Sequence, residues 1–247
     1  MTLPAADKLM RPDRPTLAFR YLPGAGPTVV FLPGYMSDMA GGKATAVLAD
    51  CAKRGQACLL LDYAGCGLSE GRFADQTLTD WRDDVLDLIA AKVAGPVLLV
   101  GSSLGGWLML LVALALPADR VAGLIGIAPA PDFTEWGFSD AEKAIIQSEG
   151  QLLEETPYSD QPYVTTRAFW ESGQANRVLD GPIALACPVH LLHGQRDDDV
   201  PWEISLQLTA ALASDDVRVT LIKDGDHRLS RDGDIALLLE TLAGMGR

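Results

Sequence analysis

The sequence is short of positive charge and of long apolar runs, and each shortage excludes a class of partner. Its 247 residues hold 20 Lys and Arg against 33 Asp and Glu, a formal net charge of −13. Such a surface repels phosphate backbones and anionic headgroups, so we expect no nucleic-acid partner and no binding to anionic membranes. No apolar run reaches the ~18 residues that a membrane-spanning helix needs, so we expect no transmembrane segment.

Cysteine and metal-binding patterns are scarce as well. The four cysteines form no C-x-x-C pair, and no histidine lies near them at metal-site spacing, so we expect no metal. The glycine-rich segment 62–69 lacks a following G-K-[ST], so we expect no cofactor. Residues 1–15 contain no apolar segment of the secretory type, and we expect neither a signal nor a transit peptide. We interpret the cysteines as reduced thiols of a cytoplasmic protein.

Short apolar runs alternate with helical stretches along the chain. We expect strands at 17–22, 28–32, 57–61, 96–100, 121–127, 188–192 and 217–222. We expect helices at 39–54, 78–93, 104–116, 204–212 and 235–242. Continuous apolar strands separated by helices predict an α/β fold, with a mostly parallel sheet covered by helices on both faces. Residues 1–247 then form a single domain.

Residues 130–182 interrupt this alternation, because they contain no clear apolar strand. Several aromatic residues lie there among polar ones, which favours a packed helical cap over a solvated excursion. In a parallel sheet the site lies beyond the carboxyl ends of the strands, which is where this insertion begins. We therefore expect the cap to supply Phe133, Trp136 and Trp170 to a substrate pocket, together with Gly34 and Met36 from the loop after 28–32.

The segment 101–105 reads Gly-Ser-Ser-Leu-Gly, between a predicted strand and a predicted helix. This is the G-x-S-x-G pattern in the strand–turn–helix setting in which it marks a nucleophile. Such a turn is tight and strained, so small residues are needed at Gly101 and Gly105. The helix beginning directly after it places partial positive charge near a developing oxyanion. We predict Ser103 as the nucleophile; the alternative is an ordinary glycine-rich turn.

A serine nucleophile needs a base, and the sequence has three histidines. His190 lies inside a predicted strand, which favours a structural role, and His193 ends the same strand. His227 follows the last predicted strand, and only His227 leaves room for an acid between itself and Ser103 in the chain order Ser, acid, His. We therefore predict His227 as the general base. The alternative for this residue is an exposed loop histidine.

The acid is expected in the loop after the strand that ends near His193. Three carboxylates compete there: Asp197, Asp198 and Asp199. The pattern H-G-x-x-D-x-x-V-P places Asp197 first, so we predict Asp197 and keep Asp199 as the alternative.

The oxyanion hole is expected to use two backbone N–H groups. The first belongs to Leu104, the residue after the nucleophile, and the second comes from the loop 33–38, in which Tyr35 is the best candidate. A side-chain role for Tyr35 or Ser37 is a weaker alternative, and a simple turn at 33–34 is another.

Five segments carry a family resemblance: FLPGYMSDM, LDYAGCGLSEG, GSSLGGWLML, LLHGQRDDDVPW and GDHRLS. They resemble, in order and at similar separations, the corresponding segments of α/β-hydrolase family serine hydrolases that remove palmitoyl groups from proteins and cleave acyl glucuronides. The resemblance begins at about Pro27 and is weakest across the cap. It implies an α/β-hydrolase fold with Ser103, Asp197 and His227 in the positions of the triad. Because the chain is short and acidic, it resembles a bacterial member of this family.

These observations lead us to expect a serine hydrolase that acts through an acyl-enzyme. Its substrates are expected to be small-molecule acyl esters or thioesters, or acylated proteins. A small serine peptidase of the prolyl-peptidase-like type is one alternative, because Gly105 and Gly106 also occur in such enzymes. The other alternative is a ligand-binding protein that keeps the hydrolase shape without catalysis.

Overall fold

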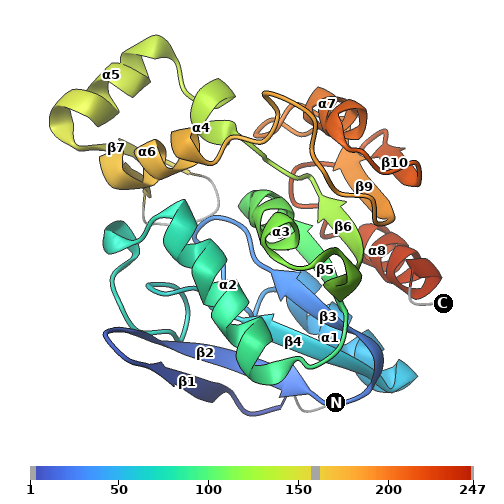
Figure 1. Cartoon of the computed structure of the whole chain (residues 1–247). Helices are drawn as coiled ribbons and strands as arrows, with labels where there is room; N and C mark the ends of the chain where they lie inside the picture. The colour runs from blue at the N-terminus through green and yellow to red at the C-terminus, as the bar shows by residue number, and fades with distance from the viewer. Residues whose placement is uncertain (1–3, 157–161, 246–247) are drawn as a thin grey trace.

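The computed structural model describes residues 4–156 and 162–245, and its centre is an eight-stranded sheet (Figure 1). The strand order is β1-β2-β4-β3-β5-β6-β9-β10. The strands are β1 (Asp7–Arg11), β2 (Arg14–Leu22), β3 (Ala25–Leu32), β4 (Gln56–Leu61), β5 (Val97–Ser102), β6 (Val121–Ile127), β9 (Val189–Gly194) and β10 (Val217–Ile222). Every neighbouring pair from β4 to β10 is parallel, whereas β1 and β2 pair antiparallel at one edge. The prediction of a mostly parallel sheet is confirmed.

Helices cover both faces of this sheet. The helices α2 (Leu78–Lys92) and α3 (Leu104–Ala115) pack on one face, and α1 (Gly42–Arg54) and α8 (Asp232–Met245) pack on the other (Figure 1). Alternate residues of each strand face opposite cores: on β3, Val30 lies in the α2–α3 core and Val29 in the α1–α8 core. The helix α7 (Glu203–Ala211) precedes β10 and packs against it. Both faces are therefore apolar, which explains the continuous apolar runs of the sequence.

Local signals place the helix ends near the site. Thr77 caps α2 in a reciprocal arrangement in which Thr77 Oγ1 accepts from the N–H of Asp80 and the Asp80 carboxylate accepts from the N–H of Thr77. Pro117 follows directly after the last turn of α3 and ends that helix. Because α3 is buried along almost its whole length, its first turn is held rigidly against the sheet.

The insertion between β6 and β9, which we call the cap, lies beyond the carboxyl ends of the strands (Figure 1). It contains α4 (Phe133–Trp136), α5 (Asp140–Glu149), β7 (Gln151–Glu154), β8 (Tyr163–Thr166) and α6 (Arg167–Ala175). The expectation of a cap without strands is wrong, because β7 and β8 pair antiparallel. Each of these strands has four residues and no fully apolar stretch, so the sequence carries no apolar run to reveal them. Among the described residues, no helix combines the length and apolarity that a membrane crossing requires.

Candidate active site

Ser103 lies on the sharp turn between β5 and α3. Its backbone has φ 54° and ψ −121°, a left-handed conformation that is strained for a residue with a side chain. Neighbouring backbone holds this turn, because Ser103 N donates to the carbonyl of Ile127 at 2.9 Å. A Cβ at Gly101 would lie 2.2 Å from the carbonyl oxygen of Gly105, and one at Gly105 would lie 2.1 Å from that of Leu32. The turn therefore needs glycine at both positions, as the motif predicts.

Three side chains that are distant in sequence meet at this turn. The Ser103 Oγ lies 3.0 Å from His227 Nε2, and His227 Nδ1 lies 2.8 Å from Asp197 Oδ2. The His227 side chain is 15% exposed and the Asp197 side chain is 0% exposed, so the series runs from a partly accessible ring to a buried carboxylate. The structure thus brings together the three residues that the sequence singles out for the triad.

The three competing aspartates have different environments within the loop 195–200. Asp197 Oδ1 accepts from the backbone N–H groups of Asp199 (3.0 Å) and Val200 (2.8 Å), which fixes the carboxylate within its own loop. Asp198 and Asp199 are exposed. Asp197 is the aspartate hydrogen-bonded to His227, and Asp199 contributes its N–H to Asp197.

Hydrogen bonds keep the Asp197 carboxyl ionised in spite of its burial. Burial acts to raise the pKa of this carboxyl, but the imidazoles of His193 and His227 and the N–H of Val200 together hold the pKa well below its usual range. A buried carboxylate that stays charged can orient one imidazole tautomer and stabilise the imidazolium ion.

His193 is the partner of Asp197 that the sequence reasoning did not identify. Its ring is 0% exposed, and its Nε2 lies 3.1 Å from Asp197 Oδ2. The four-residue spacing of His193 and Asp197 within H-G-x-x-D was the available signal. His190, on the same strand, is half-buried, and burial lowers its pKa.

The two residues expected to supply the oxyanion hole, Leu104 and Tyr35, line the same cavity as Ser103 and His227. Leu104 is the first residue of α3, so its N–H belongs to the first turn, which has no partner within the helix. Tyr35 also lines the cavity, next to Gly34. A Cβ added at Gly34 would meet the Ser103 Cβ at 3.4 Å, which brings this loop against the nucleophile.

The Tyr35 side chain points into the cap. Its hydroxyl donates to the carbonyl of Val164 on β8 at 2.5 Å, and burial raises its pKa. Aromatic rings surround it: Phe73, Trp81, Phe133, Tyr163 and Phe169. The loop that carries the second expected oxyanion donor is therefore anchored to the cap hairpin.

The cavity over Ser103 has a volume of about 590 Å³. Four of the expected pocket residues line it: Gly34, Met36, Phe133 and Trp136. Trp170 lies outside this lining, which corrects the expectation; its indole on α6 donates to the carbonyl of Thr134 at 2.9 Å and packs within the cap. The β7–β8 hairpin adds residues that sequence reasoning missed: Glu154, Tyr163 and Thr165.

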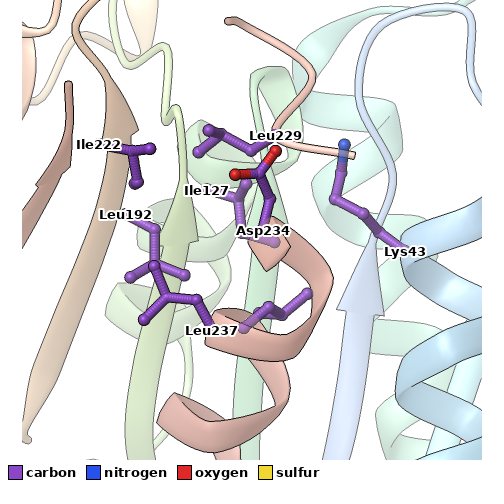
Figure 2. Close-up of a pocket in the computed structure, with 8 residues that line it drawn as sticks. Lys43, Ile127, Leu192, Ile222, Leu229, Asp234 and Leu237 are labelled. Atoms are coloured by element: carbon purple, nitrogen blue, oxygen red, sulfur yellow. The ribbon is translucent and has the colours of Figure 1, made fainter. Parts of the chain in front are cut away.

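The loop that carries His227 is held from beneath and from the side. Leu229 is 3% exposed with φ 42°, and its N–H donates to the Asp226 carboxylate at 2.9 Å. A small pocket of about 10 Å³ adjoins this loop. Figure 2 shows Leu229 and Asp234 beside the apolar side chains of Ile127, Leu192 and Leu237, which also line the pocket. Lys43 reaches from α1 to the same loop, where its Nζ donates to the carbonyl of Arg228. These contacts fix the backbone on both sides of the His227 ring.

A metal-binding alternative uses part of the same cluster. Asp197, Asp199 and His227 offer ligand atoms within 4.8 Å of one another. However, both ring nitrogens of His227 already face protein partners, Asp197 and Ser103. The geometry therefore favours proton transfer along the series over coordination of an ion.

Comparison with known proteins places this geometry in a family. Residues 29–236 match the model of the Alpha/beta hydrolase family. Palmitoyl-protein thioesterase ABHD10, mitochondrial, from Homo sapiens is 42% identical over 238 residues, which cover 95% of this chain and 78% of that protein.

Two solved structures are similar over almost their whole length. Alpha/beta hydrolase domain-containing protein 10 from mouse superposes with a TM-score of 0.91 at 39% identity and covers 98% of both chains. A protein from Agrobacterium vitis S4 gives the same TM-score and coverage at 38% identity. The chain belongs to the alpha/beta hydrolase family.

Proposed function

We propose that this chain hydrolyses carboxylic thioesters or esters through a Ser103–His227–Asp197 triad and an acyl-enzyme intermediate. The observation that carries the proposal is the unbroken hydrogen-bonded series from Ser103 Oγ through His227 to Asp197, which opens onto the cavity under the cap. The relatives named as palmitoyl-protein thioesterases support acyl transfer to water as the reaction.

The first half-reaction forms the acyl-enzyme. Ser103 Oγ attacks the acyl carbonyl carbon while His227 Nε2 takes the hydroxyl proton, and Asp197 stabilises the imidazolium ion. The N–H groups of Leu104 and Tyr35 hold the oxyanion of the tetrahedral intermediate. The intermediate collapses, the bond to the leaving thiol or alcohol breaks, and His227 donates its proton to that group.

The second half-reaction releases the acid. Water attacks the Ser103 ester after giving a proton to His227, and the same two N–H groups hold the second oxyanion. Collapse then frees the carboxylic acid and returns the proton to Ser103 Oγ. Apart from water, the cycle consumes only the acyl substrate, so it needs no cofactor.

The substrate class follows from the cavity and from the relatives. Phe133, Trp136 and Tyr163 line the cavity and offer apolar surface for an acyl chain. We propose acyl thioesters, including palmitoylated proteins, and acyl esters as substrates. The cytoplasmic location expected from the sequence stays a prediction, since the human relative is named as mitochondrial.

The test is labelling and turnover of matched serine variants. Ser103→Ala is expected to abolish labelling by a fluorophosphonate probe and to lower kcat by about 10⁴-fold or more on 4-nitrophenyl esters and on acyl thioesters. Ser102→Ala, the neighbouring serine of the motif, is the control and keeps both. Folded Ser103→Ala protein that still reacts with the probe rules the triad out. Turnover of dipeptide amides in preference to thioesters favours the peptidase alternative. No turnover of esters, thioesters or dipeptide amides by the folded protein favours a binding protein.

A further inference from the structure

The Asp197 carboxylate accepts hydrogen bonds from two imidazoles through one oxygen. Its Oδ2 lies 2.8 Å from His227 Nδ1 and 3.1 Å from His193 Nε2. His193 comes from the end of β9 and is 0% exposed, so no solvent competes for this contact. The triad therefore has a fourth member that substrate cannot reach.

The hydrogen-bond partners of His193 define its tautomer and its orientation. Its Nε2 faces two oxygens that only accept, the Asp197 carboxylate and the carbonyl of Val200, both at 3.1 Å, so Nε2 carries the proton. Its Nδ1 lies 2.7 Å from Ser205 Oγ on α7 and accepts from that hydroxyl. Ser205 is also 0% exposed. The ring is thereby fixed between α7 and the loop that bears the acid.

We propose that His193 is a positioning residue, which holds the Asp197 carboxylate in the plane and at the distance that His227 requires. The inference rests on the proposed function, because positioning of Asp197 matters only if His227 acts as the base. The two backbone N–H groups hold Oδ1, whereas Oδ2 accepts from His227 and His193; without His193, His227 would be the partner that remains on Oδ2.

The electrostatic consequence can be measured. The groups that face the Asp197 carboxylate are His193 from β9, His227 from the loop before α8, and Asp199 from its own loop. Loss of the His193 N–H removes a stabilising partner of the anion, so the pKa of Asp197 rises. The more basic carboxylate also binds the imidazolium form of His227 more strongly. The stronger pairing with the imidazolium moves the acid limb of the kcat/KM profile to higher pH, while Asp197 itself stays ionised over that limb.

The experiment compares two substitutions of His193 with a control on the same strand. His193→Leu removes the donor, and His193→Gln returns an N–H near the position of Nε2. We expect His193→Leu to lower kcat/KM about 10- to 100-fold, the effect of one hydrogen bond to a buried charge, and to shift the acid limb upward. We expect His193→Gln to restore most of the rate and the original limb. His190→Leu, which loses a histidine of β9 away from the acid, is expected to change neither quantity.

The outcomes separate this inference from the proposed function. Activity that depends on Ser103, together with a folded His193→Leu protein whose pH profile is that of the wild type, overturns the positioning role alone. Equal losses in both His193 variants with no shift of the limb also overturn it, because a purely structural histidine would behave so. Activity that survives Ser103→Ala overturns both proposals. If His193→Leu does not fold, Ser205→Ala decides: an upward shift of the limb supports the role, and an unchanged limb overturns it.

Discussion

At the scale of single residues, the loops around the cavity contain left-handed backbone at positions that are not glycine: Met36, Ser103 and Leu229, with φ of 51°, 54° and 42°. This backbone conformation costs about 1–3 kcal/mol at each such residue, and it persists only where contacts with the surrounding structure stabilise it. At Leu229 these contacts are the hydrogen bond from its N–H to the Asp226 carboxylate and the packing of its side chain at the small apolar pocket. The strain is therefore held by contacts that can be removed one at a time, without touching the triad.

Lys43 is one such contact, and its protonation gives a pH-dependent prediction. Burial, with Arg228 nearby, lowers its pKa from 10.5 to about 8 in the folded protein. Between these values the unfolded chain binds a proton that the native protein lacks, so this group makes the native state more stable as pH rises from about 8 to about 10.5. We expect the unfolding free energy of wild type relative to Lys43→Met to increase over that range in urea titrations.

The control for this prediction is Lys53→Met, an exposed lysine on the same helix. A pH-dependent difference of the same size in Lys53→Met would assign the effect to the loss of any lysine from α1 rather than to the burial of Lys43. If the unfolding free energy of wild type relative to Lys43→Met falls as pH rises, the result contradicts a lowered Lys43 pKa in the folded protein. In activity assays at pH 7, Lys43→Met is expected to lose about 5-fold in kcat/KM, since one hydrogen bond to the His227 loop is gone.

At the scale of elements, Tyr35 joins the cap hairpin, β7–β8, to the loop 33–38, which carries the proposed second oxyanion donor and which we call the oxyanion loop. Tyr35 lines the cavity, and its hydroxyl donates to the carbonyl of Val164 on β8. Tyr35→Phe keeps the ring among its aromatic neighbours and removes only the hydroxyl. We expect kcat/KM to fall about 5-fold for long-chain acyl esters, the effect of one lost hydrogen bond, and less for acetyl esters, which depend less on the cap.

Tyr21→Phe on β2, far along the sheet from the cap, is the matched control and is expected to leave both substrates unaffected. Equal losses on acetyl and long-chain esters would show that the hydroxyl does not couple cap and oxyanion loop in a chain-dependent way.

The strands show which elements the sequence could predict and which it could not. The bounds of β6 agree with the predicted strand, because a buried strand in a parallel sheet is a continuous apolar run. The bounds of β10 agree as well, although this strand lies at the edge of the sheet and is partly exposed, because it is rich in β-branched residues. The strands β7 and β8 were missed, since a short hairpin packed on one side has no such run. The strand β1, with the sequence DKLMR, was missed for the same reason.

The site shows the same division between local and non-local information. Ser103 and Gly101 were predictable because a tight turn imposes its own residue types. His193 and Asp197 are four residues apart in H-G-x-x-D, a spacing that could have suggested their contact, but the contact itself depends on the path of the loop after β9. The indole of Trp170 donates to the carbonyl of Thr134 within the cap, and no local pattern distinguishes this residue from a pocket residue.

At the scale of the whole molecule, the formal net charge of −13 creates an electric field that acts on a charged substrate before the substrate reaches Ser103. The field acts over about one Debye length, ~10 Å at 0.1 M salt and ~30 Å at 0.01 M. A substrate with several negative charges, such as an acyl-coenzyme A thioester, is repelled, whereas a neutral ester of the same acyl chain is not. Added salt is therefore expected to change kcat/KM for the anionic substrate and not for the neutral one, because only the anionic substrate is repelled by the net charge.

We expect kcat/KM for acyl-coenzyme A to rise several-fold between about 10 and 200 mM NaCl, and that for the neutral 4-nitrophenyl ester to stay within about 2-fold. Steady-state assays on both substrates at each salt concentration measure this, with the neutral ester as the internal control for effects of salt on folding. Lys43 and Arg228 border the cavity, but four acidic residues line it too, so the lining does not reverse the sign of the overall field: Asp38, Glu154, Asp198 and Asp199. A fall in kcat/KM for acyl-coenzyme A with salt would mean that these two cations, rather than the net charge, govern the approach of anionic substrates.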